Sequence, residues 1–270
     1  MRPCVTISLV PEARGGPFVF WDDLEGSCRE AAELGFPAVE IFPPDPEILH
    51  TRNVGALLAR HQLQLAAVGT GAGWVKHGLT LTDADPARRQ AAREFVANVV
   101  RRAGELGASA IIGSMQGRHG GTIAREQALD LLADALQELG SLASQFHVPL
   151  FYEPLNRYET NLCTTMASGV ELLQRAGSPH VRLLADLFHM NIEEVDMAEA
   201  IRAAGPHLGH VHFVDSNRRP AGAGHTRFEP ILAALRAIDY RGYLSAEALP
   251  WPDSIGAARQ TLLAFRQWNP

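Results

Sequence analysis

Four residues with metal-binding side chains recur at similar intervals in the second half of the chain. Each stands at or near the end of a short apolar segment: Glu153, Asp186, His212 and Glu247, separated by 33, 26 and 35 residues. Three carboxylates gathered in one place would repel one another and would be costly to bury unless a cation neutralised them. We therefore expect the four side chains to bind one divalent cation. A donor set rich in oxygen and free of thiolate favours Mn²⁺, with Mg²⁺, Co²⁺ and Zn²⁺ also open.

Taken one at a time, these residues have explanations that involve no metal. A carboxylate at the end of a strand, such as Asp186, commonly caps a helix or lies in solvent. Because side chains alternate along a strand, His210 and His212 lie on the same side of their segment, and one of them is expected to be structural. The joint placement of the four residues is what favours a metal site.

Other charged residues follow the same segments and are candidates for contacting a substrate. Glu159 lies shortly after Glu153, His189 follows Asp186 by three residues, and Arg218 follows His212 by six. His189 and Arg218 would form a cationic clamp on substrate oxygens, or else lie in solvated loops. Arg118 is a candidate anion contact, although it also fits an ordinary surface arginine.

The elements that must position these residues alternate regularly along the chain. Eight short apolar segments have the length and composition of buried strands. They are Val5–Leu9, Ala38–Ile41, Leu65–Val68, Ala110–Ile112, Leu150–Tyr152, Arg182–Ala185, Gly209–Val214 and Tyr243–Ala246. Amphipathic helices are expected between them, most clearly at Pro86–Leu106, Ala124–Phe146, Met197–Ala204 and Phe228–Ile238. Leu34-Gly35 and Leu106-Gly107 have the form of glycine stops at helix ends.

Eight β-then-α units in 270 residues predict an α/β fold, a single (β/α)₈ TIM barrel that forms one domain over residues 1–270. A doubly wound sheet is the competing fold, but no GxGxxG pattern follows the first predicted strand. In such a barrel the active residues lie at the carboxyl ends of the strands. The four metal candidates occupy those ends on four successive strands.

Composition excludes several other classes of protein. The formal charge of −6 and the pI near 6.0 disfavour binding of a long anionic polymer such as nucleic acid. No apolar segment approaches the roughly 20 residues that a membrane span needs, and no leader-like segment opens the chain. Three scattered cysteines indicate reduced thiols. We expect a cytoplasmic protein without membrane contact.

A glycine-rich loop, GTGAG at residues 69–73, superficially resembles a phosphate-binding loop. It lacks the Lys-Ser/Thr pair that follows in a P-loop, so nucleotide binding is not expected. The glycines are better explained by a tight turn or by close approach of the backbone to a ligand.

Four segments resemble the motifs of a known family, the ketose 3-epimerases. They are EPLNRYET, LLADLFHMNIEE, HVHFVDSNR and YLSAEALP. This family, which includes D-tagatose, D-psicose and L-ribulose 3-epimerases, belongs to the xylose isomerase-like TIM barrels. The likeness is closest to 5-keto-L-gluconate epimerases and extends to VGTG, GLTLT and IIG…GR in the first half.

The resemblance implies roles for individual residues. The metal ligands of the family fall on Glu153, Asp186, His212 and Glu247, in agreement with the spacing argument. Its residues that hold the substrate fall on Glu159, His189 and Arg218. The resemblance also implies a homo-oligomer, either a dimer or a tetramer, that acts on a small-molecule sugar.

The residue types fit inversion of the carbon next to a carbonyl, C3 of a free ketose or keto-sugar acid. One carboxylate, Glu153 or Glu247, would remove the proton and the other would return one to the opposite face of an enediolate. A divalent cation on the carbonyl and hydroxyl oxygens would stabilise that species. We expect an unphosphorylated substrate, with Arg118 as the contact for the carboxylate of a keto-acid.

Three other functions are compatible with parts of the pattern. An aldose–ketose or hydroxypyruvate isomerase would use the same metal site. An AP-endonuclease-like DNA repair nuclease would need further histidines on the first-half strands, where VGTG and IIGS stand instead. A sugar-binding barrel without catalysis would not need both Glu153 and Glu247.

Overall fold

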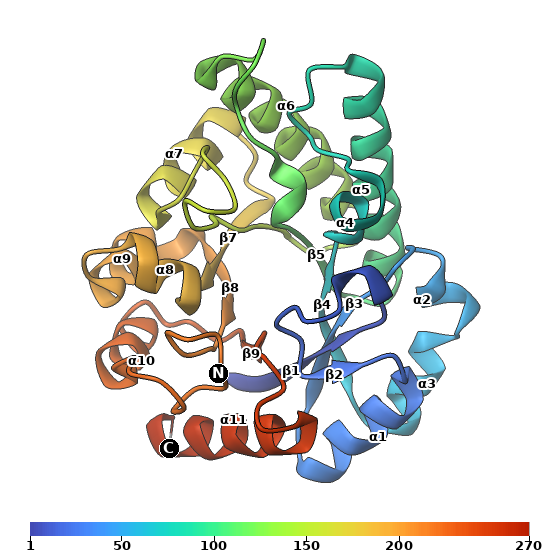
Figure 1. Cartoon of the computed structure of the whole chain (residues 1–270), viewed down its shortest axis with the longest axis vertical. Coiled ribbons are helices and arrows are strands. Elements are labelled where there is room, and N and C mark those ends of the chain that lie inside the picture. The colour runs from blue at the N-terminus through green and yellow to red at the C-terminus, as the bar shows by residue number, and fades with distance from the viewer. Residues whose placement is uncertain (270) are drawn as a thin grey trace.

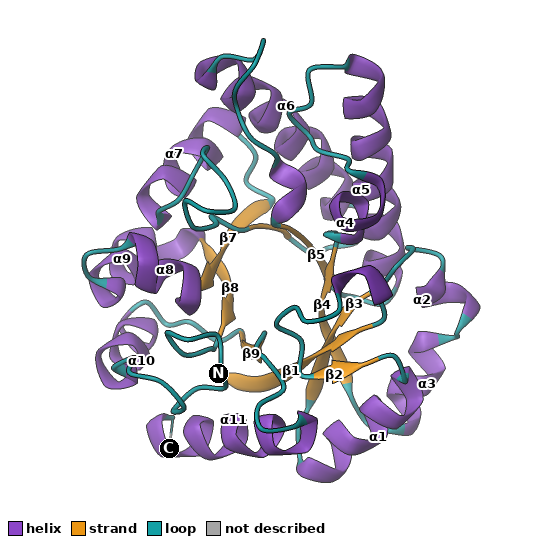
Figure 2. Ribbon diagram, in the orientation of Figure 1, coloured by secondary structure: helices purple, strands orange, loops and turns teal. Residues whose placement is uncertain are grey.

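The computed structural model describes residues 1–269, and its centre is a closed barrel of parallel strands (Figures 1 and 2). Neighbouring strands pair in the order of the sequence, and β9 pairs with β1 to close the ring. The barrel strands are β1 (Arg2–Ser8), β3 (Ala38–Phe42), β4 (Gln64–Gly69), β5 (Ser109–Ile112), β6 (Leu150–Tyr152), β7 (Val181–Asp186), β8 (Leu208–His212) and β9 (Tyr243–Ala246). The (β/α)₈ TIM barrel predicted from the sequence is confirmed.

Helices surround this barrel on the outside (Figure 2). They are α1 (Leu24–Leu34), α2 (Ile48–Thr51), α3 (Val54–Arg60), α4 (Ala72–His77), α5 (Pro86–Glu105), α6 (Arg125–Ser144), α7 (Met166–Ala176), α8 (Leu187–Glu193), α9 (Met197–Ala204), α10 (Phe228–Ala237) and α11 (Ser254–Trp268). Short 3₁₀ turns occupy Pro11–Ala13, Ser114–Gln116 and Gly205–His207. The predicted helices agree with α5, α6, α9 and α10 to within two residues at each end.

The ends of these helices follow from local sequence. Asp85 caps α5 by accepting a hydrogen bond from the amide of Ala87, and Pro86 occupies the first turn, where no amide hydrogen is needed. Gly35 ends α1 in the left-handed conformation, with φ of 96°. Gly107, just after α5, is left-handed with φ of 70°. Both predicted glycine stops are therefore present.

A two-residue strand, β2 (Phe20–Trp21), was not predicted. It pairs with the end of β1 outside the closed ring. The segment before it carries Phe18 over the mouth of the barrel, where the ring of Phe18 lies 4.6 Å from that of Phe42. The segment before β2 therefore contributes Phe18 to the wall of the cavity described below.

Side chains alternate between the outside and the inside of the barrel along each strand, so the large core outside is separate from the barrel interior. Outward residues such as Val68, Ile112 and Leu183 pack in one large cluster with the helices. Inward residues on the same strands form a small separate cluster: Ala67, Ile111, Phe151 and Leu184. The inward positions nearest the carboxyl ends of the strands are polar, and they form the candidate site. Among the described residues, no helix is long and apolar enough to cross a membrane.

Candidate metal centre and active site

The four predicted metal-binding residues stand at the carboxyl ends of neighbouring strands. Glu153 follows β6, Asp186 ends β7, His212 ends β8, and Glu247 follows β9. Asp186 also caps α8, because its Oδ1 accepts hydrogen bonds from the amides of Phe188 and His189. The helix-cap explanation for Asp186 is thus correct, and it occupies Oδ1, while Oδ2 faces His212 and Arg218.

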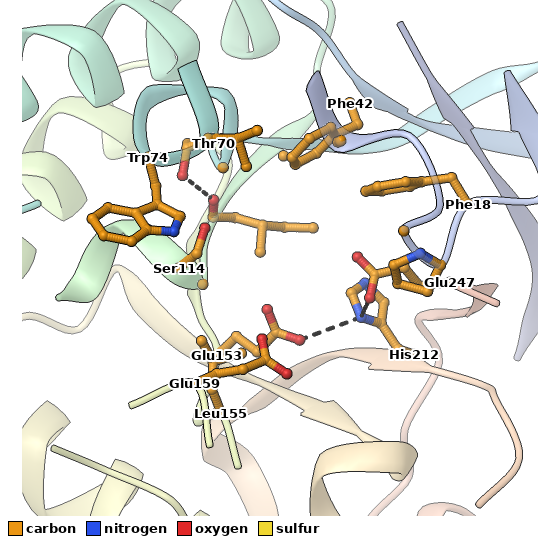
Figure 3. A pocket seen from close by; sticks show the side chains of 18 of the residues that line it. Phe18, Phe42, Thr70, Trp74, Ser114, Glu153, Leu155, Glu159, His212 and Glu247 are labelled. Atoms are coloured by element: carbon orange, nitrogen blue, oxygen red, sulfur yellow. Dashed lines mark hydrogen bonds and ion pairs between the residues drawn. The ribbon is translucent and has the colours of Figure 1, made fainter. Parts of the chain in front are cut away.

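The structure brings these four side chains together. Figure 3 shows three of them, Glu153, His212 and Glu247, at the cavity. One ligand atom from each lies within 4.8 Å of the others. His212 Nδ1 is the centre of the group, at 3.0 Å from Asp186 Oδ2, 3.4 Å from Glu153 Oε1 and 3.5 Å from Glu247 Oε2. Glu153, Asp186 and His212 are buried, and Glu247 is 15% exposed at its side chain.

A divalent cation fits this group of residues. Glu153 Oε1 is buried and accepts no hydrogen bond within residues 1–269, which is a costly state for a carboxylate oxygen. Three carboxylates and one imidazole form the oxygen-rich donor set that Mn²⁺ and Mg²⁺ prefer. The cation would supply the missing partner for Glu153 and offset the mutual repulsion of the acids.

The electrostatic environment shifts the pKa values of the three carboxyl groups in different directions. Burial raises the pKa of Glu153, and the charge of Asp186 adds to the increase. Burial likewise raises the pKa of Glu247 to about 8, against the opposing effect of His212 and Arg218. Burial alone would raise the pKa of Asp186, but the charge of Arg218 holds it well below its usual range. The two glutamates that we expect to act as acid and base therefore bind a proton more readily than Asp186 does.

Arg218 spans two of the acids. Its Nη1 donates a hydrogen bond to Asp186 Oδ2 at 2.6 Å, and its Nη2 pairs with Glu247. The guanidinium lies 4.8 Å from the centre of the Phe188 ring, and the backbone of Arg218 is left-handed, with φ of 62°. This placement brings the charge of Arg218 to the cavity, as the sequence predicted.

His189 is buried beside the acids, but it is not a cation. Its Nδ1 lies 2.7 Å from the side-chain nitrogen of Asn156, which can donate to it. Burial lowers the pKa of His189 to about 4, so the ring is neutral at pH 7. The proton then resides on Nε2, which lies 4.0 Å from Glu153 Oε1. His189 would contact a substrate as a neutral hydrogen-bond donor, which differs from the cationic clamp expected from the sequence.

Glu159 and Arg118 lie farther from the candidate metal ligands. Glu159 accepts a hydrogen bond from Asn156 at 2.9 Å and lines the same cavity as Glu153. Arg118 is exposed and donates to the carbonyl of Tyr158 at 3.2 Å. It lines an adjoining cavity. Trp74, Ser114 and Glu159 line both this cavity and the one that contains Glu153.

The cavity over the acids has a volume of about 340 Å³. Apolar side chains also line it: Phe18, Phe42, Trp74, Ile111 and Leu155. Phe18, Phe42 and Trp74 lie across the cavity from Glu153 and Glu159 (Figure 3). Glycines of the GTGAG loop make room for this wall. A Cβ at position 69 would lie 2.3 Å from Cδ2 of Phe42, and one at position 71 would lie 2.7 Å from Cζ of that ring. The loop thus accommodates an aromatic side chain, and its last two residues, Ala72 and Gly73, already belong to α4.

A family model described as a xylose isomerase-like TIM barrel matches residues 28–265. The chain belongs to this family. It is 33% identical to an L-ribulose 3-epimerase of Methylomonas sp. (strain DH-1), over 81% of this chain and 76% of that protein. It is 30% identical to a D-psicose 3-epimerase of Agrobacterium fabrum, over 87% and 79% respectively. The chain is therefore an enzyme of the isomerase class, related to the ketose 3-epimerases.

Solved structures agree with this relationship. A D-allulose 3-epimerase from Methylomonas sp. superposes with a TM-score of 0.82 at 26% identity and covers 98% of each chain. A 3-keto-D-glucoside 4-epimerase of E. coli superposes with a TM-score of 0.80 at 23% identity, over 99% of this chain and 100% of that one, which supports the fold alone.

Sequence reasoning missed three contributors to the site in this family member. Phe18 and Phe42 form part of its apolar wall, and Glu40 lies beside the candidate metal site with both carboxylate oxygens near imidazole rings. A signal for Glu40 was present, because a charged residue interrupts the apolar segment AVEIF. The aromatic wall had no such signal, since it depends on contacts between distant loops.

Proposed function

We propose that the chain is a divalent-metal-dependent epimerase that inverts C3 of a free ketose or keto-sugar acid. The observation that carries this proposal is the arrangement of Glu153 and Glu247. The two carboxylates reach the group from β6 and β9 and lie 3.4 and 3.5 Å from the same nitrogen of His212. Both line the cavity in which a substrate would bind.

Inversion requires one group that removes a proton and a second that delivers one from the other side. A bound divalent cation would supply stabilisation of the negative charge that develops on the substrate oxygens. Glu153 and Glu247 take the two proton-transfer roles and exchange them in the reverse direction. The pKa of Glu247, raised to about 8, suits this task, because an acid–base catalyst works best with a pKa near the operating pH, and burial shifts the pKa of Glu153 in the same direction.

Three other residues hold the substrate in this proposal. The neutral ring of His189 donates from Nε2, Arg218 supplies a positive charge beside Asp186, and Glu159 accepts from substrate hydroxyls at the cavity rim. The apolar wall excludes water from the opposite side, which strengthens each of these polar contacts. One cation is proposed, with Mn²⁺ the expected metal and Mg²⁺, Co²⁺ and Zn²⁺ as alternatives.

The substrate is proposed to carry no phosphate. Lys76, which closely follows the GTGAG loop, donates to the carbonyl of Pro44 at 3.1 Å and does not line the cavity. Arg118, at the adjoining cavity, is the proposed contact for the carboxylate of a keto-acid such as 5-keto-L-gluconate. We also propose a cytoplasmic location, in keeping with the three free cysteines, and a homo-oligomer, dimer or tetramer, from the resemblance to the family.

The test is turnover of a panel of free ketoses and keto-acids, with Mn²⁺ and with a chelator. The proposal expects a ketose product with inverted C3, formed only when the metal is present. An aldose product would identify an isomerase on the same site. Equal turnover in chelator would overturn the metal-dependent reaction.

A further inference from the structure

Glu40 is a buried charge that the proposed reaction does not use. It stands in the middle of β3, points into the barrel, and is 5% exposed. A carboxylate in such a place is costly unless its oxygens are paired. The side chains that pair with the oxygens of Glu40 indicate its role.

Each oxygen of Glu40 contacts a different histidine of β8. Oε2 lies 2.8 Å from Nε2 of His210, and Oε1 lies 3.2 Å from Nε2 of His212. The ring of His210 is in turn stacked on Phe151, with ring centres 5.2 Å apart and planes 17° apart. His210 and Phe151 therefore fix one end of the carboxylate, and the other end meets the metal-binding histidine.

The contact with Glu40 selects which nitrogen of His212 is available to a cation. An imidazole binds a metal through a ring nitrogen that carries no proton, and the hydrogen bond at the other nitrogen decides which one that is. If Nε2 donates to Glu40, Nδ1 is left for the cation. Without Glu40, the proton has a competing position on Nδ1, because Asp186 Oδ2 lies only 3.0 Å away and would accept from it.

We propose that Glu40 is a positioning residue, held by His210, that keeps the proton of His212 on Nε2 and directs Nδ1 to the cation. The proposal rests on one geometric observation: the carboxylate of Glu40 contacts the imidazoles of both His210 and His212. The inference rests on the cation site of the proposed function, but it does not depend on the substrate.

The test measures cation binding to purified protein, first stripped of metal, by isothermal titration calorimetry with Mn²⁺. Glu40→Ala removes the acceptor, and Glu40→Gln keeps an oxygen at the same distance from the backbone. The expected result is a 10- to 100-fold loss of Mn²⁺ affinity in Glu40→Ala, the usual range for loss of a partner of a ligating histidine. Glu40→Gln should lose less, since its amide oxygen can accept the same hydrogen bond.

A second readout is the visible absorption spectrum of the Co²⁺-loaded protein, which responds to loss or rearrangement of the histidine ligand. Leu132→Ala, in the buried face of α6, is the control for a general loss of stability, and it should leave both readouts unchanged. Metal-free melting temperatures of all variants identify any that are unfolded before titration.

Wild-type Mn²⁺ affinity and an unchanged Co²⁺ spectrum in folded Glu40→Ala would overturn the positioning role and leave the epimerase proposal intact. Equal losses in Glu40→Ala and Glu40→Gln would also overturn it, because charge rather than orientation would then be responsible. If the wild-type protein binds no divalent cation, the proposed function itself fails, and the inference with it.

Discussion

Gly113 leaves the space that the carboxylate of Glu153 occupies. A Cβ at position 113 would lie 2.5 Å from Oε2 of Glu153, closer than atoms of this kind approach in proteins. The glycine stands directly after β5 and the glutamate directly after β6, so the two residues are neighbours across adjacent strands. The absence of a side chain at position 113 is therefore part of the geometry of the proposed acid–base pair.

Gly113→Ala is expected to displace Glu153 from the metal-binding group. The added methyl group forces the carboxylate to move, so Mn²⁺ affinity and turnover should both fall by about tenfold or more, since small displacements at a reacting centre are costly. Titration calorimetry and steady-state kinetics measure these effects. The control is Gly55→Ala in α3, where the new atom meets only the flexible side chain of Leu106, at 3.1 Å. Full activity in Gly113→Ala would show that Glu153 does not need its present position.

Replacing either proposed acid–base residue is expected to abolish the reaction. Glu153→Gln and Glu247→Gln each retain an oxygen but cannot transfer a proton, so kcat should fall by about 10²- to 10⁴-fold. The kinetics are measured at Mn²⁺ concentrations that saturate each variant, because both changes also remove a ligand. Glu171→Gln, exposed on α7, is the matched control. Native turnover in either active-site variant would assign proton transfer to another group.

The stability of the cation-free protein is expected to decrease as pH rises. Burial raises the pKa of Glu247 from an ordinary value of 4.5 to about 8, so the folded state binds this proton more tightly than the unfolded state. The resulting stabilisation is fully present below pH 4.5 and is lost as the pH increases through about 8. Thermal unfolding of metal-free protein across this range should show a falling melting temperature.

Two comparisons test whether Glu247 is responsible for this pH dependence. Glu247→Gln has no proton to lose, so the decline should be smaller in this variant. Saturating Mn²⁺ should also reduce it, because the cation replaces the proton as the partner of the carboxylate. An identical decline in wild type and Glu247→Gln would place the responsible group elsewhere in the protein.

Arg118 is expected to affect acidic substrates selectively. Arg118→Ala should raise KM for a keto-acid by about tenfold, which corresponds to ~1.5 kcal/mol, the lower end for a charged hydrogen bond, because Arg118 is exposed. Neutral ketoses should be almost unaffected, and Arg118→Lys should retain part of the effect. Equal losses for acidic and neutral substrates would contradict a carboxylate contact, while the ketose epimerase assignment would survive.

The barrel and the grouping of the four candidate metal ligands at its rim could be predicted because both depend on local patterns. Strand alternation and the position of strand ends assign Glu153, Asp186, His212 and Glu247 to one rim, whatever the details of the loops. The same reasoning also correctly predicted that His210 and His212 share a face.

Contacts between distant segments could not be predicted in this way. The bridge from Glu40 to His212 spans 172 residues, and the space beside Gly113 is explained only by the neighbouring strand. His189 was expected to be charged, but its burial lowers its pKa and keeps it neutral. Arg118 follows β5 as expected, although the turn at Ser114–Gln116 directs it to the adjoining cavity.

Exchange of a substrate carbon-bound proton with solvent tests the central claim most directly. The reaction is run in D₂O with Mn²⁺-loaded protein and the best ketose or keto-acid of the panel, and deuterium is located by NMR. The account predicts that deuterium enters C3 of the product during turnover, and that chelator and Glu153→Gln or Glu247→Gln abolish this incorporation. Epimerisation with complete retention of the original hydrogen at C3 would contradict proton transfer through these two glutamates.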